Sequence, residues 1–350
     1  MTYDSFRPGQ EWLDTDGKAI HLHGGSVLHL GNAWYWYGED KTNSRPGSGI
    51  WHSGVRAYRS TDLYNWEDLG HILPARPDLP GHALHPASML DRPHIIYNER
   101  TRKFVCWVKV MGADDLQKSW VFTADDFLGP YQVVREGIHP LGMNAGDFDL
   151  VVDPSTGNAY YYFDKVHSEL VCADLTDDYT DIQGTHSSHF PRPYPPLVRE
   201  APAYFMHGST HYLITSGTSW YFPNPSEIAS APDYHGPWTV LGDPHPSDPS
   251  RTSFHSQVSS VLTLPDGTNI AIADRWLPDV SDELIRRSWA ATEAQFTGGR
   301  RDPQVDAFVH ESDPDTSRAR HVWLPIIFRD GNPVIEWHDE WTLEQAAALR

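Results

Sequence analysis

The chain has 350 residues, with 27 Lys or Arg against 47 Asp or Glu, so its formal net charge is −20. Nucleic acids and anionic membranes bind clustered cations, so this balance argues against both kinds of partner. The 14 Trp, 16 Tyr and 13 Phe residues supply ample apolar area for a core, which argues against disorder. No apolar run approaches the roughly 18 residues that a membrane span needs.

The first residues and the cysteines predict a cytoplasmic location. Met1 to Arg7 contain neither a basic stretch nor an apolar run of the kind that forms a secretory signal. Cys106 and Cys172 are the only cysteines, so a disulfide scaffold and a Cys-ligated zinc site are excluded. Both cysteines lie in apolar, strand-like runs, and we expect buried thiols.

Strand-like segments recur along the chain with short breaks between them. Residues 26–30 and 33–39 flank Gly31-Asn32, which predicts a β-hairpin, and 54–60 and 66–70 complete a first group of strands. The same order then repeats. The later groups comprise residues 94–97, 103–108, 119–124 and 129–134; then 148–153, 158–163 and 169–175; then 203–206, 211–216, 227–230 and 236–240; and then 257–262, 268–273, 322–326 and 334–337.

The repeat predicts an all-β fold, a five-bladed β-propeller. The period is roughly 50–60 residues with about four strands in each unit, which is typical of propeller blades. Gly129-Pro130-Tyr131 and Gly236-Pro237-Trp238 each open a last strand and mark equivalent positions in two blades. We therefore expect one catalytic domain over residues 1–350, with the first ~20 and last ~10 residues as closing or peripheral segments. Helical periodicity is confined to 282–296 and 342–350.

The innermost strands of a propeller converge on a central funnel, so polar residues near their ends are candidates for a functional site. Glu200 lies between Arg199 and a run of small residues, where a partly desolvated carboxyl could serve as a general acid. An ion pair with Arg199 is the alternative. Asp91 occupies the matching place in an earlier blade, with a turn or cap role as its alternative. Of Asp147 and Asp149 we expect one to face the funnel and the other to satisfy turn backbone.

Other kinds of chemistry find less support in the sequence. His21 and His23 would lie on one face of a strand, but a hydrogen-bonded, substrate-contacting or solvated pair is a simpler interpretation than a metal site, and we predict no metal ligands. No Gly-x-Ser-x-Gly elbow is present. Sugar rings stack on aromatic side chains and their hydroxyls bond to carboxylates. An acidic, aromatic-rich mouth therefore suits glycoside hydrolysis, which needs two carboxyl groups.

At these residues the sequence resembles glycoside hydrolase family 43, whose fold is a five-bladed β-propeller. It looks most like the subfamilies that contain exo-β-1,3-galactanases and some arabinofuranosidases. The similarity extends from about His21 to Trp341. The phrases that carry it are His23-Gly24-Gly25 with Tyr35-Trp36-Tyr37-Gly38-Glu39, Tyr58 to Leu63 with Asn65-Trp66, Arg92 to Glu99, Arg199 to Ala203, Ser256-Gln257, and Ala273 to Trp276 with Trp323-Leu324-Pro325.

The resemblance implies an inverting mechanism with Glu200 as the general acid. The family's usual base aspartate on the first blade is absent, as in the galactanase-like subfamilies, and the residues that match those near the water there are Asp91 and Gln257. Asp91 is then the candidate base, although it stands where those subfamilies have a glutamate, and Gln257 positions the water. Asp147 matches the aspartate that positions and tunes the acid. The predicted substrate-binding residues are His23, Glu39, Arg92, Trp220, Asp274, Arg275 and Trp276.

The resemblance therefore implies an exo-acting, inverting glycosidase. It would release a terminal galactose- or arabinofuranose-type sugar from arabinogalactan-like glycans or oligosaccharides. We expect no required cofactor, with a structural calcium ion as an option that the resemblance leaves open. The alternative, which the missing first-blade aspartate raises, is a sugar-binding propeller without turnover.

Overall fold

The strands form five four-stranded antiparallel sheets, each made from consecutive strands. The computed structural model describes residues 2–112, 116–306 and 314–349. The blades comprise β1 (His23–Leu30), β2 (Ala33–Glu39), β3 (Gly54–Ser60) and β4 (Glu67–Pro74); β5 (Met89–Asn98), β6 (Lys103–Met111), β7 (Gln117–Ala124) and β8 (Gln132–Ile138); β9 (Ala145–Val152), β10 (Ala159–Lys165), β11 (Glu169–Leu175) and β12 (Ile182–His189); β13 (Arg199–His207), β14 (Thr210–Gly217), β15 (Ser226–Ala231) and β16 (Thr239–Gly242); and β17 (Gln257–Thr263), β18 (Asn269–Arg275), β19 (Arg320–Arg329) and β20 (Asn332–Ile335). The predicted five-bladed β-propeller is confirmed.

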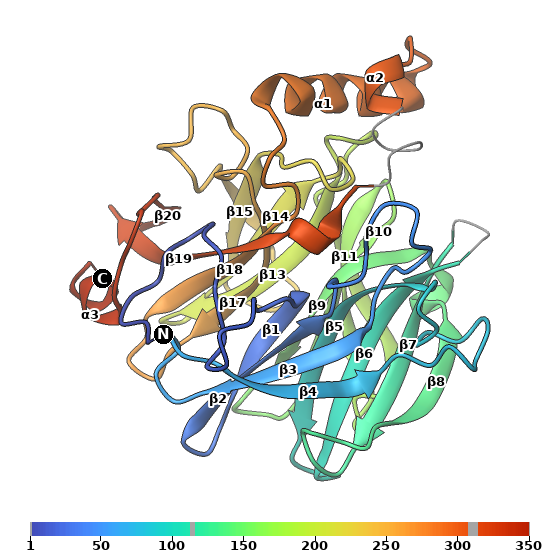
Figure 1. The fold of residues 1–350 in the computed structure, drawn as a ribbon, viewed down its shortest axis with the longest axis vertical. Helices are drawn as coiled ribbons and strands as arrows, with labels where there is room; N and C mark the ends of the chain where they lie inside the picture. The colour runs from blue at the N-terminus through green and yellow to red at the C-terminus, as the bar shows by residue number, and fades with distance from the viewer. Residues whose placement is uncertain (1, 113–115, 307–313, 350) are drawn as a thin grey trace.

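The blades close into a ring through their first strands. β1, β5, β9, β13 and β17 contact one another in that order, and β17 also contacts β1. The two ends of the chain lie near each other beside the fifth blade (Figure 1). There the backbones of Phe6 and Trp341 exchange hydrogen bonds of 2.8 and 3.0 Å, and their rings stack with centroids 4.2 Å apart. The ring thus closes by packing between the first strands of the blades, while the two chain ends bind to each other outside the sheets.

Aromatic and β-branched residues form the core because each strand buries side chains against the neighbouring blade. Trp36, Trp66 and Trp323 are almost fully buried and pack edge to face between the first and last blades. Cys106 and Cys172 are free and buried, as expected. Within the described residues, no helix is long and apolar enough to span a membrane.

In the part of the chain that the structure describes, three helices interrupt or follow the strands: α1 (Asp282–Thr297), α2 (Pro303–Asp306) and α3 (Leu343–Ala348). The short 3-10 turns η1 (Pro140–Gly142) and η3 (Thr316–Arg318) lie in loops. α1 begins where the Ser281 side chain accepts a hydrogen bond from the Leu284 amide, and it ends at Gly298 in the left-handed conformation. Inserted between β18 and β19, α1 lies beyond the strand ends, away from the chain termini (Figure 1).

Strand β12 was not predicted from the sequence. β12 carries Gln183, Thr185 and His186 as exposed residues, and it has no alternation of apolar and polar side chains. It forms because the edge of β11 offers it backbone partners, from Leu170 paired with His189 to Leu175 paired with Ile182. An outermost strand has only one sheet neighbour, so its sequence is less constrained than that of an inner strand.

Candidate active site

Irregular pairing at one end of the inner strands turns equivalent side chains toward the funnel. The register between first and second strands shifts just after Asp91 in β5 and Glu200 in β13, and after Val258 in β17. Such bulges bend a strand and re-aim its side chains. Asp91 and Glu200 therefore occupy matching places in two blades, as predicted, and Gln257 begins β17 beside the third bulge.

A cavity of about 630 Å³ opens at this end of the propeller. Asp91, Arg92, Asp147, Glu200 and Gln257 line it from four different blades. Three further predicted residues, Glu39, Trp220 and Trp276, also line it. The remaining lining residues were not predicted from the sequence: Trp51, Lys109, Met111, Gln117, Val166, His167, Pro195, Thr218, Tyr221, Thr292, Gln295 and Phe296.

Glu200 is a partly buried carboxyl whose pKa suits proton transfer near neutral pH. Burial, and then the negative charge of Asp147, raise its pKa to about 7, although Lys109 acts in the opposite direction. An acid that transfers protons most effectively has a pKa near the working pH. Arg199 does not pair with Glu200; its guanidinium donates to Thr215 Oγ1 and to the backbone oxygens of Thr215 and Pro225. The ion-pair alternative for Glu200 is therefore not what the structure shows.

Gln257 is fixed by hydrogen bonds at both ends of its amide group. Its Nε2 donates to Glu200 Oε1 over 3.2 Å and to Ser216 Oγ over 2.8 Å. Its Oε1 accepts from Arg92 Nη2 and from Trp276 Nε1. Because donors hold the oxygen on one side, the amide nitrogen faces Glu200.

Asp147 lies between two cations. Its carboxylate is 2.9 Å from Arg92 Nη2 and 2.8 Å from Lys109 Nζ. Burial alone would raise the pKa of Asp147, but Arg92 and Lys109 hold it below its usual range, so the group stays ionised. Asp149 instead faces His94 at 3.0 Å and lines a separate cavity of about 190 Å³. Only one of the two aspartates faces the site. Residues two apart share a face of a regular strand, but the pairing of β9 with β10 is irregular between Ala145 and Phe148, so Asp147 and Asp149 diverge.

Asp91 is an ionised carboxylate held by three donors. Trp51 Nε1 donates to it over 2.7 Å, while Lys109 Nζ lies 3.3 Å and Lys41 Nζ 3.6 Å from its oxygens. Burial opposes ionisation, but the two lysines and the Trp51 hydrogen bond lower the pKa of Asp91 below its ordinary value. Lys109 therefore links the candidate base to Asp147, because it contacts both carboxylates.

Glu39 is a fourth carboxyl at the cavity, and it is buried. Its Oε2 lies 2.8 Å from Lys41 Nζ. Burial raises the pKa of Glu39 well above its usual value, and the negative charge of Asp91 adds to that, although the ammonium group of Lys41 opposes both. The pKa of Glu39 therefore lies above that of Asp91.

Three predicted substrate-binding residues do not line this cavity. His23 is fully buried, and Asp274 borders only a small adjoining space with Trp276 and Gln257. Arg275 points away from the funnel: its Nη2 donates to the Phe254 backbone oxygen over 2.9 Å, and its guanidinium lies 5.3 Å from the Trp337 ring. His23 and Asp274 are buried, so these two residues support the site from below its surface.

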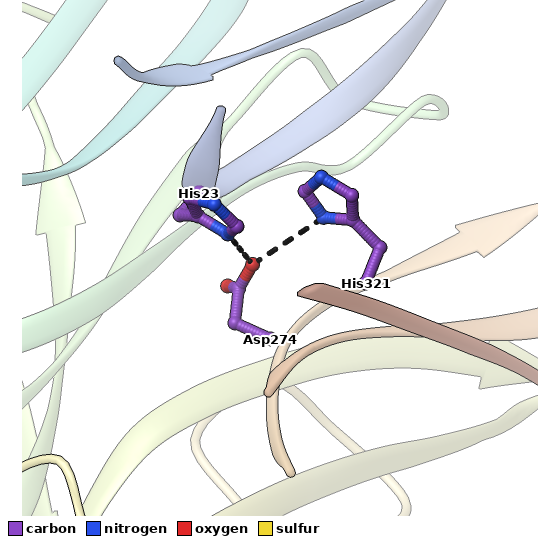
Figure 2. A group of neighbouring side chains, drawn as sticks. All are labelled: His23, Asp274 and His321. Carbon is purple, nitrogen blue, oxygen red and sulfur yellow. Dashed lines mark hydrogen bonds and ion pairs between the residues drawn. The ribbon is translucent and has the colours of Figure 1, made fainter. Parts of the chain in front are cut away.

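His23, Asp274 and His321 lie together behind the cavity floor (Figure 2). Asp274 accepts hydrogen bonds from His23 Nδ1 over 2.8 Å and, at its other oxygen, from the Gly24 amide over 2.9 Å. His321 Nδ1 lies 3.7 Å from the same carboxylate. Calcium takes six to eight oxygen ligands, so two imidazoles and one carboxylate do not fit that ion. The hydrogen bonds instead fasten the start of β1 to β18.

The chain belongs to the glycosyl hydrolases family 43, whose family model matches residues 21–272. The protein is a glycosidase. Among curated proteins, no sequence matches it.

Solved structures similar to this one include two family 43 β-1,3-galactosidases, both 28% identical. The first has a TM-score of 0.78, and the match covers all of this chain and 65% of the other, so this chain spans about two thirds of that protein. The second, in complex with galactodeoxynojirimycin, has a TM-score of 0.77 with 97% and 100% covered. An exo-β-1,3-galactanase from Phanerochaete chrysosporium with β-1,3-galactotriose is 25% identical, with a TM-score of 0.76 and 98% and 70% covered.

Proposed function

We propose that this glycosidase removes terminal galactose from β-1,3-linked galactans or galacto-oligosaccharides, with inversion at the anomeric carbon. The observation that carries the proposal is the pairing of unlike carboxyls in one cavity: the pKa of Glu200 is raised to about 7, whereas that of Asp91 is lowered. Two carboxyls whose environments separate their pKa values suit an acid and a base. The β-1,3-galactosidase and galactanase names of the similar structures support the choice of sugar and linkage.

In the proposed reaction the protonated Glu200 gives its proton to the glycosidic oxygen as the bond to the anomeric carbon breaks. A water molecule attacks that carbon from the opposite face, and Asp91 takes the proton that the water loses. The proton that Asp91 gains and the one that Glu200 gives up are then exchanged with solvent. Inverting pairs lie about 6.5–9.5 Å apart because a water molecule must fit between carboxylate and sugar.

The other residues of the floor orient the reacting groups. Asp147 raises the pKa of Glu200 and so keeps its proton available. Gln257, held by Arg92 and Trp276, presents its amide nitrogen to Glu200 and fixes the direction of the carboxyl. Glu39 and the indole of Trp276 offer a polar group and an apolar face to the terminal sugar.

The shape of the site supports action from the chain end. The cavity has a charged floor built by inner strands of the ring, and on one side α1 raises its wall. A cavity closed at its base admits the end of a glycan, whereas cleavage within a chain needs a groove open at both ends. We therefore assign the floor to the terminal, non-reducing sugar.

Product analysis tests the proposal. The purified protein is incubated with β-1,3-galactobiose, β-1,3-galactotriose and nitrophenyl glycosides of β-D-galactopyranose, β-D-galactofuranose and α-L-arabinofuranose, and proton NMR records the first anomer formed. We expect galactose from the β-1,3-linked substrates, appearing first as the α-anomer. Release of arabinose alone, or of β-galactose first, would contradict the assigned sugar or the assigned stereochemistry.

A further inference from the structure

Helix α1 forms the wall of the cavity on the side of Glu200. Thr292, Gln295 and Phe296 from its last turns line the cavity. Thr292 is buried, whereas Gln295 is exposed and Phe296 is 43% exposed. An aromatic ring held half exposed at a sugar-binding cavity presents an apolar face to whatever enters.

Contacts with two loops of the blade that carries Glu200 hold α1 in place. Tyr194, in the loop before β13, donates from its hydroxyl to Glu293 Oε1 over 3.3 Å. Trp289 Nε1 donates to the backbone oxygen of Pro223, in the loop after β14, over 2.9 Å. Ile285 is fully buried in a cluster that contains Trp276. The helix is therefore a built part of the site rather than a loosely attached insertion.

The aromatic contact of Phe296 extends this wall to a third blade. The Phe296 ring meets His167, just after β10, edge to face with centroids 4.8 Å apart. α1 itself belongs to the fifth blade and bonds to loops of the fourth. Because the blades follow one another in the ring, these contacts form an arc centred on the blade that carries Glu200, opposite the Asp91 side.

The position of the general acid decides which part of a substrate meets this arc. A general acid donates to the oxygen of the leaving group, so the leaving sugar must lie next to Glu200. The terminal sugar occupies the floor between Glu200 and Asp91. The leaving sugar then extends toward Gln295, Phe296 and His167.

We infer that α1 forms a binding subsite for the leaving sugar, in which Phe296 stacks on the apolar face of the ring and Gln295 bonds to its hydroxyls. The inference rests on the proposed function, since it takes that sugar to be a second, β-1,3-linked galactose. Binding energy from this subsite contributes to the transition state only when the leaving group is a sugar.

The test compares two substrates that differ in their leaving group. β-1,3-Galactobiose has a galactose leaving group, whereas β-D-galactopyranosyl fluoride has a fluoride ion that cannot reach α1. The variants are Phe296→Ala, Gln295→Ala and the control Arg286→Ala, which removes an exposed side chain of the same helix outside the cavity. Thermal unfolding of each variant checks that the fold is retained.

We expect Phe296→Ala to lower kcat/KM for galactobiose about 10-fold, the equivalent of one stacking contact, and to change that for the fluoride by less than about twofold. Gln295→Ala should show the same selectivity with a smaller loss, and Arg286→Ala should change neither substrate. Equal losses on both substrates, or no loss on either, would overturn the subsite while the wild-type activity upheld the proposed function. A wild-type protein that cleaves neither galactoside would remove the proposed function, and the subsite with it.

Discussion

The amide nitrogen of Gln257 donates to Oε1 of Glu200 over 3.2 Å, joining the first strands of two neighbouring blades at the cavity floor. The contact has one orientation, because Arg92 and Trp276 both donate to the other end of the same amide. Glu200 is thereby connected through Gln257 and Arg92 to Asp147, the group whose charge raises its pKa. The acid and the residues that tune it form one hydrogen-bonded unit.

Replacing Asp147 with Asn should move the alkaline limb of the pH profile to lower pH. Glu200 acts while protonated, so in the wild type kcat/KM should fall as the pH rises through about 7. Asp147→Asn removes a negative charge that raises this pKa and leaves Lys109, which lowers it, in place. Profiles of kcat/KM for galactobiose from pH 4 to 9 check the shift. A limb that stays in place or moves upward would show that Asp147 does not tune Glu200.

Asp91→Asn should lower kcat for galactobiose by at least ~10²-fold, because an amide cannot take the proton from water. The variant keeps an oxygen that can accept the Trp51 hydrogen bond, so the local structure should persist. In the wild type, Asp91 is ionised above the acidic limb, since its pKa is lowered by Lys109 and Lys41 against the effect of burial. Retention of most of the activity in Asp91→Asn would mean that another group activates the water, with Glu39 as the next carboxyl to replace.

Gly24 and Gly31 offer a matched pair for testing the support of Glu39. Both have φ of +62°, so an alanine at either position carries a similar backbone cost of about 1–2 kcal/mol. A Cβ at Gly24 would lie 2.7 Å from Glu39 Oε1, whereas a Cβ at Gly31 has no neighbour within 4 Å. Gly24→Ala should therefore lower activity as well as stability, and Gly31→Ala should lower stability alone. Equal activity in the two variants would show that the position of Glu39 does not matter.

His52 should make the fold less stable in acid. Burial lowers the pKa of His52 to about 4, and in the unfolded chain it returns to about 6.5. The unfolded state then binds more protons between these values, so stability is lost as the pH falls from about 6.5 to 4, on the order of 3 kcal/mol from this residue.

Asn at position 52 can accept the Gly54 amide bond that His52 Nδ1 accepts, but it does not titrate. In denaturant unfolding at pH 7 and pH 4.5, His52→Asn should lose less stability between the two pH values than the wild type. The same loss in both proteins would assign the acid sensitivity to other groups.

Sequence patterns predict the blades well because inner strands alternate with turns that carry strong local signals, as at Gly31-Asn32. They place Asp91, Glu200 and Gln257 at one mouth because all three begin inner strands. Lys109 was missed although a lysine in the otherwise apolar run of β6 was a visible signal. Its role depends on pairing opposite Asp91 across the sheet. Strand register of this kind is set by tertiary structure.

The wall formed by α1 could not be predicted, since helical periodicity shows that a helix forms but not which blade it covers. His23 and Asp274 were expected at the substrate and instead bond to each other behind the floor. A histidine and an aspartate can equally well bind a sugar or bond to each other. The sequence does not show that the backbone of β1 turns at Gly24, whose amide donates to Asp274.

The role of Glu200 as general acid is tested most directly by the kinetics of Glu200→Gln on β-1,3-galactobiose, whose leaving group needs a proton. The variant keeps the size of the side chain and an oxygen that can accept from Gln257. We predict that kcat/KM falls by at least ~10²-fold, with a folded protein by thermal unfolding. Turnover of galactobiose by Glu200→Gln at close to the wild-type rate would contradict the account.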